Sequence, residues 1–358
     1  MMIRPTLLLT LTMIVVGWSD VPAQIAVDDN NVSATVIDRV LVLTGDSADN
    51  YLTFRNNRAG LPSLQGNRGT TINGQPRFRL SNLDIDGIEI DLGDGNDTVI
   101  FRGVSLEGGG TVALLRFRGG PGSDRFVCRG ADDGSFFGGD VFLDGDEGRD
   151  RFDFSDYLVD GNAVVRTGED DDRVKIVDCA VSDSLLIDTE SGQGFIDIEV
   201  LGATLLSVFG GDQIDRFNLG GLAINTFGGF GPAGGTENGC FVFTGASRDL
   251  VSMDQVQGIG TVLDIDSGDG NDDVTLNQVA LLDSPDPQPI RVACGAGNDT
   301  VIASNLLNIN TFDGAVPSLG LIDGGPGSRD FLMIDADSQT AVNHENFELV
   351  SDGNEPAN

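Results

Sequence analysis

The segment Ile88–Phe101, IEIDLGDGNDTVIF, contains two runs of alternating apolar residues on either side of a turn rich in glycine and acidic residues. Alternation with a period of two gives a β-strand one buried face. Glycine supplies the positive φ angles that tight turns need, and Asp and Asn hydrogen-bond nearby backbone amides. The segment is therefore predicted to form a strand, a tight turn anchored by Asp97, and a second strand.

The same pattern recurs along the chain. Clear copies occupy residues 119–126 (GGPGSDRF), 263–274 (LDIDSGDGNDDV) and 294–301 (CGAGNDTV). Weaker copies end at Asp150, Asp172 and Asp215, and decayed copies are placed at 66–69, 191–194 and 234–239. Units of roughly 22 to 31 residues cannot bury an apolar face alone, whereas stacked units form a continuous core.

This periodicity predicts an all-β fold, a right-handed parallel β-helix (solenoid) of about a dozen coils. The alternative is a β-sandwich or a pair of antiparallel β-domains. Hairpins in such folds favour two-residue turns and do not require one turn at coil-length intervals. The four cysteines fall on separate coils, too far apart for disulfides, so we expect mostly buried, reduced side chains.

The N-terminus carries features of an export signal. Arg4 precedes an apolar run over residues 7–16, and Val21 and Ala23 place small residues at a cleavage site. A first transmembrane helix is the alternative, but the run is too short to span comfortably. We predict a signal peptide over 1–23, a parallel β-helix with capping segments over 24–345 and a C-terminal tail over 346–358. The protein is expected to be secreted, and to be extracellular or at the cell surface.

The net charge of the protein limits the classes of partner that it can bind. The 358 residues include 56 acidic and 21 basic side chains, which gives a formal net charge of −35. Nucleic acids and anionic lipids would be repelled, whereas cations and basic protein faces would be attracted. We therefore expect calcium ions, and extracellular polysaccharide or a surface protein, as partners. We expect no nucleic acid and no membrane span in the mature chain.

The turns resemble the hemolysin-type (RTX-like) calcium-binding repeat, Gly-Gly-x-Gly-x-Asp-x-(large apolar)-x, although here the motif occurs about once per coil and several copies lack glycines. In that family, backbone carbonyls and the Asp carboxylate hold Ca²⁺ between stacked turns. The resemblance implies Ca²⁺ as cofactor and Asp97, Asp124, Asp272 and Asp299 as side-chain ligands.

Electrostatics independently favours a cation. Stacked carboxylates about 5 Å apart repel by roughly 1 kcal/mol in water, and Ca²⁺ accepts oxygen ligands in irregular geometry. The alternative is that Asp and Gly only cap the turns, with no ion. Each repeated turn ends in an aspartate that we call its anchor. The arginines that directly follow an anchor should point outward, because adjacent residues of a strand face opposite sides. These are Arg125, Arg151, Arg173 and Arg216.

No nucleophile motif or His/Cys metal cluster is present, and the single histidine, His344, lies outside the clear repeats. We assign no catalytic residue and expect a non-catalytic, calcium-stabilised solenoid for adhesion, matrix building or carbohydrate binding. The alternative is a lyase or hydrolase that acts on acidic polysaccharide. A lyase would use the basic side chains Arg125, Arg151, Arg173 and Lys175, and a hydrolase would use carboxylates within Asp170–Asp172.

Overall fold

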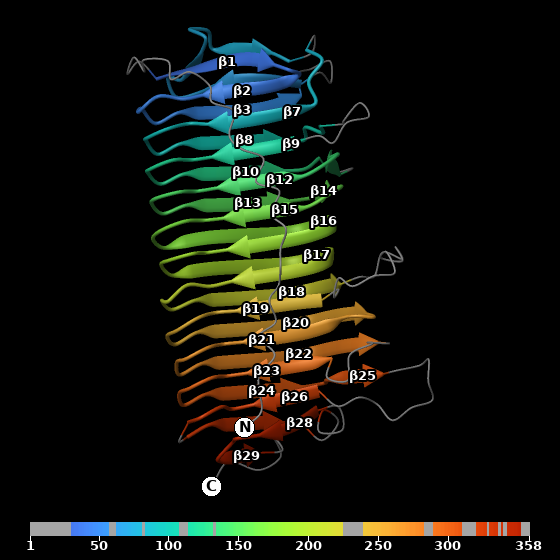
Figure 1. Cartoon of the computed structure of the whole chain (residues 1–358). Coiled ribbons are helices and arrows are strands. Elements are labelled where there is room, and N and C mark those ends of the chain that lie inside the picture. The colour runs from blue at the N-terminus through green and yellow to red at the C-terminus, as the bar shows by residue number, and fades with distance from the viewer. Residues whose placement is uncertain are drawn as a thin grey trace.

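The computed structural model describes residues 30–56, 62–80, 83–106, 114–131, 134–224, 239–282, 289–309, 320–327, 329–335, 338 and 342–351. These residues form a parallel β-solenoid, as predicted, and its strands stack as rungs from the N-terminal to the C-terminal end (Figure 1). None of the described residues belongs to a helix of the length and apolarity that a membrane crossing requires. The predicted signal peptide over residues 1–23 lies outside the described residues.

Each regular turn contributes a strand to each of three columns, which we call A, B and C in chain order after the anchor aspartate. Column A contains β3 (Tyr51–Asn56), β8 (Thr98–Arg102), β10 (Arg125–Arg129), β13 (Arg151–Ser155), the first parts of β16 (Asp172–Asp188), β17 (Gly194–Phe209), β18 (Arg216–Ile224), β20 (Leu250–Ile259) and β22 (Asp273–Leu282), and β24 (Thr300–Ser304), β27 (Phe331–Ile334) and β29 (Leu349–Ser351).

Column B is short and contains β11 (Ser135–Phe137), β14 (Tyr157–Val159), the later parts of β16, β17, β18, β20 and β22, and β25 (Leu307–Ile309). Column C contains β2 (Val40–Thr44), β7 (Gly87–Asp91), β9 (Leu114–Arg118), β12 (Val141–Asp144), β15 (Ala163–Arg166), the ends of β16 and β17, β19 (Gly239–Phe243), β21 (Val262–Asp266), β23 (Ile290–Ala293), β26 (Gly320–Asp323) and β28 (Val342–Glu345).

One residue in the left-handed conformation makes the corner between columns A and B in many turns. Asp156 (φ 60°), Asp178 (φ 51°), Gln278 (φ 55°) and Asn305 (φ 55°) occupy this position. Asp and Asn tolerate positive φ better than most residues other than glycine. A residue of this kind six positions after the anchor thus ends one strand and redirects the chain into the next.

Alternate residues of columns A and C point into the coil and form one continuous apolar core. The ring of Phe101 stacks on that of Phe54, with centroids 4.2 Å apart. Phe126 joins the two columns, because its ring centroid lies 5.1 Å from Phe117 in column C. Aromatic side chains therefore pack both between successive rungs and across the coil.

The cysteines also belong to these stacks. All four lie within the described residues and are unpaired, as predicted. Cys128, Cys240 and Cys294 are buried, and Cys179 is partly buried against the core. They act as small apolar fillers.

The first part of the chain departs from the expected coil. β1 (Asn31–Ile37) pairs antiparallel with β2, and β4 (Pro62–Gly66) lies antiparallel between β3 and β6 (Arg77–Arg79). A short β5 (Thr71–Ile72) completes this cap. The decayed turn expected at 66–69 therefore lies in an antiparallel cap, which covers the open end of the core.

The number of turns and the C-terminal boundary of the coil also differ from the prediction. The coil has about nine turns, slightly fewer than the predicted dozen. Of the other decayed copies, 191–194 is a true turn, whose Ser191 bridges to Glu169, whereas 234–238 lies outside the described residues. β29 pairs with β27, so the coil continues into the segment assigned to a tail, and residues 352–358 lie outside the described residues.

We expect Phe126→Ala to lower the free energy of unfolding by about 3–5 kcal/mol, because the side chain is fully buried and its loss leaves a cavity. Chemical denaturation measures this change. Leu158→Ala, at a side chain that is 42% exposed, is the control and should have a much smaller effect. Equal effects would contradict the core assignment.

Candidate functional site

The turn edge, where column C ends and column A begins, requires left-handed residues at two places. Before Asp124 these are Gly120 (φ 96°) and Gly122 (φ 145°). A Cβ on Gly122 would lie 1.6 Å from the carbonyl oxygen of Gly95 in the neighbouring turn, so conformation and space both require glycine. Other turns place Asp at an equivalent position, as Asp146 does with φ 77°. This tolerance explains why the glycine pattern decays while the turn persists.

The anchor aspartates form a continuous column along this edge. The backbone N–H of Asp97 donates to Oδ1 of Asp124 (2.7 Å), that of Asp124 to Asp150 (2.7 Å), and that of Asp150 to Asp172 (2.7 Å). Further along, the same bond joins Gly194 to Asp215 (2.6 Å), Asp215 to Asp249 (2.8 Å), Asp249 to Asp272 (2.8 Å), Asp272 to Asp299 (2.9 Å) and Asp299 to Asp330 (2.9 Å). We call these residues the anchor column.

Other residue types occupy the ends and one interior position of the anchor column. The N–H of Asn50 donates to Asp97 (2.6 Å) at the first turn, and the N–H of Asp330 donates to Oε2 of Glu348 (2.6 Å) at the last. Gly194 has no side chain, so the N–H of Asp172 donates to the carbonyl of Gln193 instead (3.1 Å). The hydrogen-bonded path is thus complete, but the row of carboxylates is interrupted once.

The second oxygen of these carboxyl groups is left without a partner. In eight of the described anchors Oδ2 is buried and makes no hydrogen bond, and none of these residues is more than 3% exposed. They are Asp97, Asp124, Asp150, Asp172, Asp249, Asp272, Asp299 and Asp330. Asp215 differs, because its Oδ2 accepts a hydrogen bond from the N–H of Gly211 (3.0 Å). Burial of an unpaired carboxylate oxygen is costly unless a proton or a cation compensates it.

Burial also changes the acidity of the column. Desolvation raises the pKa of Asp97 to about 8 and that of Asp124 to about 7, while the backbone hydrogen bonds that they accept act in the opposite direction. Desolvation likewise raises the pKa of Asp150 to about 8 and that of Asp272 to about 7. Neighbouring anchors contribute, since the charge of Asp124 raises the pKa of Asp97. Burial therefore disfavours the charged form of these carboxyl groups near neutral pH.

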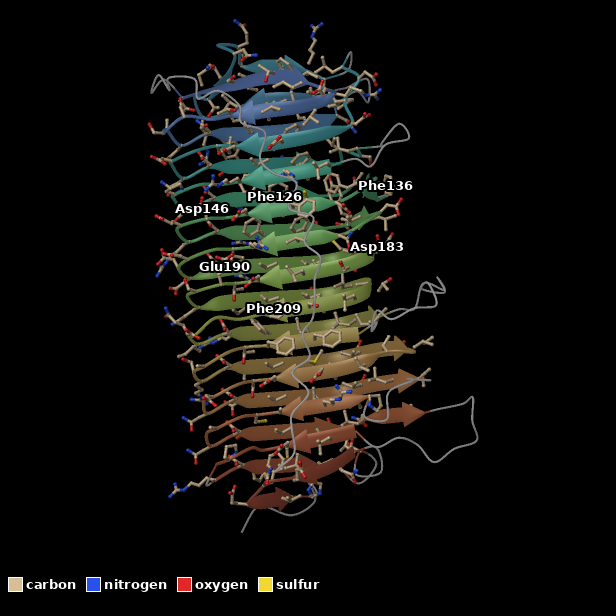
Figure 2. All side chains as sticks on the ribbon, viewed as in Figure 1. Phe126, Phe136, Asp146, Asp183, Glu190 and Phe209 are labelled. Atoms are coloured by element: carbon tan, nitrogen blue, oxygen red, sulfur yellow. The ribbon has the colours of Figure 1, made fainter. Side chains whose placement is uncertain are left out.

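Additional oxygen atoms surround the column. The hydroxyls of Thr167 and Ser267 are buried beside Asp172 and Asp272 and favour the charged form of these carboxyl groups. The surface of the same edge is acidic, and its exposed carboxylates include Asp94, Glu147, Glu169, Asp212 and Asp269. Figure 2 shows Asp146 and Glu190 at this edge, and Asp183 at the opposite one. A cation that approaches the turns meets negative potential before it meets the buried oxygens.

The four ligands predicted from sequence all lie in the anchor column, as two separate neighbouring pairs. Asp97 is adjacent to Asp124, and Asp272 is adjacent to Asp299. Among the described residues, no three His, Cys, Asp or Glu side chains converge into a metal cluster. A cation here would depend on backbone carbonyls and hydroxyls for most of its ligands, so calcium binding stays a prediction.

Sequence reasoning missed two members of the column. Asp249 was overlooked because a turn was placed at 234–239, whereas the rung spacing is 34 residues from Asp215 and 23 residues on to Asp272. The signal was available in the alternation of Val251 and Met253 directly after Asp249, which are both fully buried. Glu348 was missed because it is not an aspartate and lies in the segment assigned to a tail.

The basic residues of the lyase alternative lie on the outer face of column A, as the alternation predicted. Arg125 and Arg151 both pair with Asp153 (2.9 and 2.8 Å), and Lys175 pairs with Asp197 (3.1 Å). Each of these side chains would have to break its ion pair before it could act as the catalytic base of a lyase. For the hydrolase alternative, Asp172 is buried in the anchor column, whereas Asp170 is exposed, so they do not face each other across a cleft.

Comparisons with protein family models, with curated proteins and with solved structures find no match to this chain.

In calcium-free buffer, we expect the free energy of unfolding to fall as the pH rises from about 4 to about 8. Unfolded aspartates release their protons near 3.8, whereas folded anchors with pKa values of about 7 to 8 retain theirs, so the folded state binds more protons across this window. Each unit of pKa shift corresponds to ~1.4 kcal/mol per group. Denaturation in EGTA at a series of pH values measures the slope.

Asp150→Asn is the matched variant for this prediction, because Asn keeps an acceptor oxygen for the N–H of Asp124 and removes the titrating group. Its stability should depend less steeply on pH than that of the parent protein. Stability that stays constant or rises with pH in EGTA would contradict the electrostatic account of the anchor column.

Proposed function

We propose that the protein is an exported, non-catalytic β-solenoid that calcium stabilises along the turn edge, and that it works as a binding or structural rod outside the cell. The observation that carries this proposal is the column of buried carboxylates, eight of which have one oxygen without a hydrogen-bond partner. Export is supported by the signal-like sequence over residues 1–23.

The donor set fits calcium in chemistry and spacing. The unpartnered atoms are carboxylate and hydroxyl oxygens, which hard divalent cations prefer. Successive rungs pair in register, so equivalent atoms repeat at the strand spacing of about 4.8 Å. That spacing is about twice a Ca²⁺–oxygen distance of about 2.4 Å, so oxygens of two successive turns could share one ion.

The pairs Asp97–Asp124 and Asp272–Asp299 would hold the ions through Oδ2, together with carbonyl oxygens of the glycine-rich turns. The bound cation would neutralise buried negative charge and so favour the stacked state over the unfolded chain. The anchors continue to orient the turns through Oδ1, whose hydrogen bonds to the preceding rung do not depend on the ion.

A binding role is supported by the long regular faces of the coil and by the ion pairs that engage Arg125, Arg151 and Lys175, three of the four candidate basic side chains. Adhesion, matrix building and carbohydrate binding all use an extended surface of this kind. An activity screen on polyuronates tests the alternative, since cleavage would reverse the non-catalytic assignment.

Calcium is expected to raise the melting temperature of the full mature chain relative to EGTA, and Mg²⁺ to do so less. An ion at 100 times its dissociation constant adds about 2.7 kcal/mol per site to the free energy of unfolding. Differential scanning calorimetry, with isothermal titration for the stoichiometry, measures both effects. Identical melting in calcium and EGTA would exclude calcium stabilisation.

The variant Asp299→Asn should lose part of the calcium-induced stabilisation and lower the stoichiometry. Asp172→Asn is a matched control, because Asp172 is an equally buried anchor whose turn lacks the glycine pattern and is followed by Arg173. Asp183→Asn, at an exposed acidic residue on the opposite edge, controls for net charge. Equal loss of calcium in Asp299→Asn and Asp172→Asn would contradict the assignment of ligands to the glycine-rich turns.

A further inference from the structure

The outer face of the solenoid at its N-terminal end carries a row of arginines. Arg55 on β3, Arg102 on β8 and Arg129 on β10 are in register on three neighbouring strands. The row continues into the cap. Arg55 lies opposite Ser63 of β4, and Ser63 lies opposite Arg79 of β6, so Arg79 is its fourth arginine. Residues directly opposite each other on paired strands share a face, and all four arginines are exposed.

These arginines have no counter-charge, unlike Arg125 and Arg151 of the same column. Among the described residues, no ion pair joins Arg55, Arg102 or Arg129 to an acidic side chain, although acidic residues outnumber basic ones by 56 to 21. By contrast, Arg125 and Arg151 share Asp153. Guanidinium groups on adjacent strands about 4.8 Å apart repel by roughly 1 kcal/mol in water. An anion bound between them would relieve that repulsion.

A pocket of about 260 Å³ opens at this row. Three arginines line it, Arg55, Arg68 and Arg102, and none of its described lining residues is acidic. The remaining lining is polar and uncharged, from Tyr51, Thr53, Gln65 and Asn67. The pocket is thus a positively charged concavity on a strongly acidic protein.

Its walls are held in place by contacts within the cap and column A. The guanidinium carbon of Arg68 lies 4.6 Å from the centre of the Tyr51 ring. Nδ2 of Asn67 donates to the hydroxyl of Thr53 (2.9 Å), and Nε2 of Gln65 donates to Oδ1 of Asn67 (3.1 Å). These bonds orient amide and hydroxyl groups beside the arginines before any ligand arrives.

We propose that this pocket binds a compact oxyanion carried by a sugar, such as the carboxylate of a uronic acid or the sulfate of a sulfated saccharide. Guanidinium groups bind planar or tetrahedral oxyanions through two parallel hydrogen bonds, which Lys cannot provide. The neighbouring amide and hydroxyl groups match sugar hydroxyls. A long polyanion would meet the acidic remainder of the coil, so the charge distribution favours a short ligand. The pocket is separate from the anchor column, and the proposal does not rest on calcium binding.

Isothermal titration of the full mature chain at low ionic strength tests the proposal, with sodium sulfate, glucuronate, glucose 6-sulfate and glucose as probes. We expect the two charged sugars to bind at least tenfold more tightly than glucose and more tightly than sulfate alone, and to weaken as salt is added. Equal binding of glucuronate and glucose, or no binding of either charged sugar, would overturn it. Sulfate that binds as tightly as both charged sugars would reduce the site to one for free oxyanions and overturn the sugar assignment.

The double variant Arg55→Gln, Arg102→Gln should weaken binding of the charged sugars at least tenfold with unchanged melting. Arg216→Gln is the matched control, because Arg216 is an exposed column A arginine outside the pocket. Should the double variant melt earlier, Arg68→Gln, at an exposed side chain, gives the same test on its own. Equal weakening in Arg216→Gln would point to the general charge of the protein and contradict a defined pocket.

Discussion

The hydrogen bond from the backbone N–H of one anchor to the carboxylate of the next is the constraint on which this solenoid depends. It recurs at 2.6–2.9 Å from Asp97 to Asp330, interrupted only where Gly194 lacks a side chain. A strand-to-strand ladder can slip by two residues without exposing its apolar face, whereas a side chain that must meet one particular amide cannot. The turn edge thereby sets the register of columns A and C, and with it the stacking of the core.

The same bond creates an electrostatic problem. Holding Oδ1 against the next turn carries the whole carboxyl group into a buried position, where Oδ2 finds no donor. Natural coils could avoid this cost with Asn, which is present at the first turn as Asn50. The use of aspartate in nearly all later turns means that the fold retains ionisable carboxyl groups along one edge, and we connect this retention to a divalent cation.

The strand geometry also decides where the arginines and the acidic residues lie on the surface. Two arginines that follow an anchor, Arg125 and Arg151, lie on the outer face and pair with Asp153 on the strand of Arg151. At the N-terminal end, the pocket that Arg55 and Arg102 line has no acidic side chain among its described residues, so these arginines form an unbalanced positive patch. The two proposed sites, one for a cation and one for an oxyanion, both derive from one repeated strand pattern and its interruption at the cap.

The repeat pattern was enough to predict the solenoid, its buried strand faces and the position of most anchors, because a period of two within strands and a recurring turn depend only on local chemistry. It also led to Asp97, Asp124, Asp272 and Asp299 as members of one column. The stacked structure was needed to show that Asp249 and Glu348 belong to it, that Gly194 interrupts it, and that β1, β4, β5 and β6 form a cap. The reason is physical: each anchor's partner is a backbone amide one rung away, at a separation that varies from 18 to 47 residues with the loops between them. No local pattern encodes that distance.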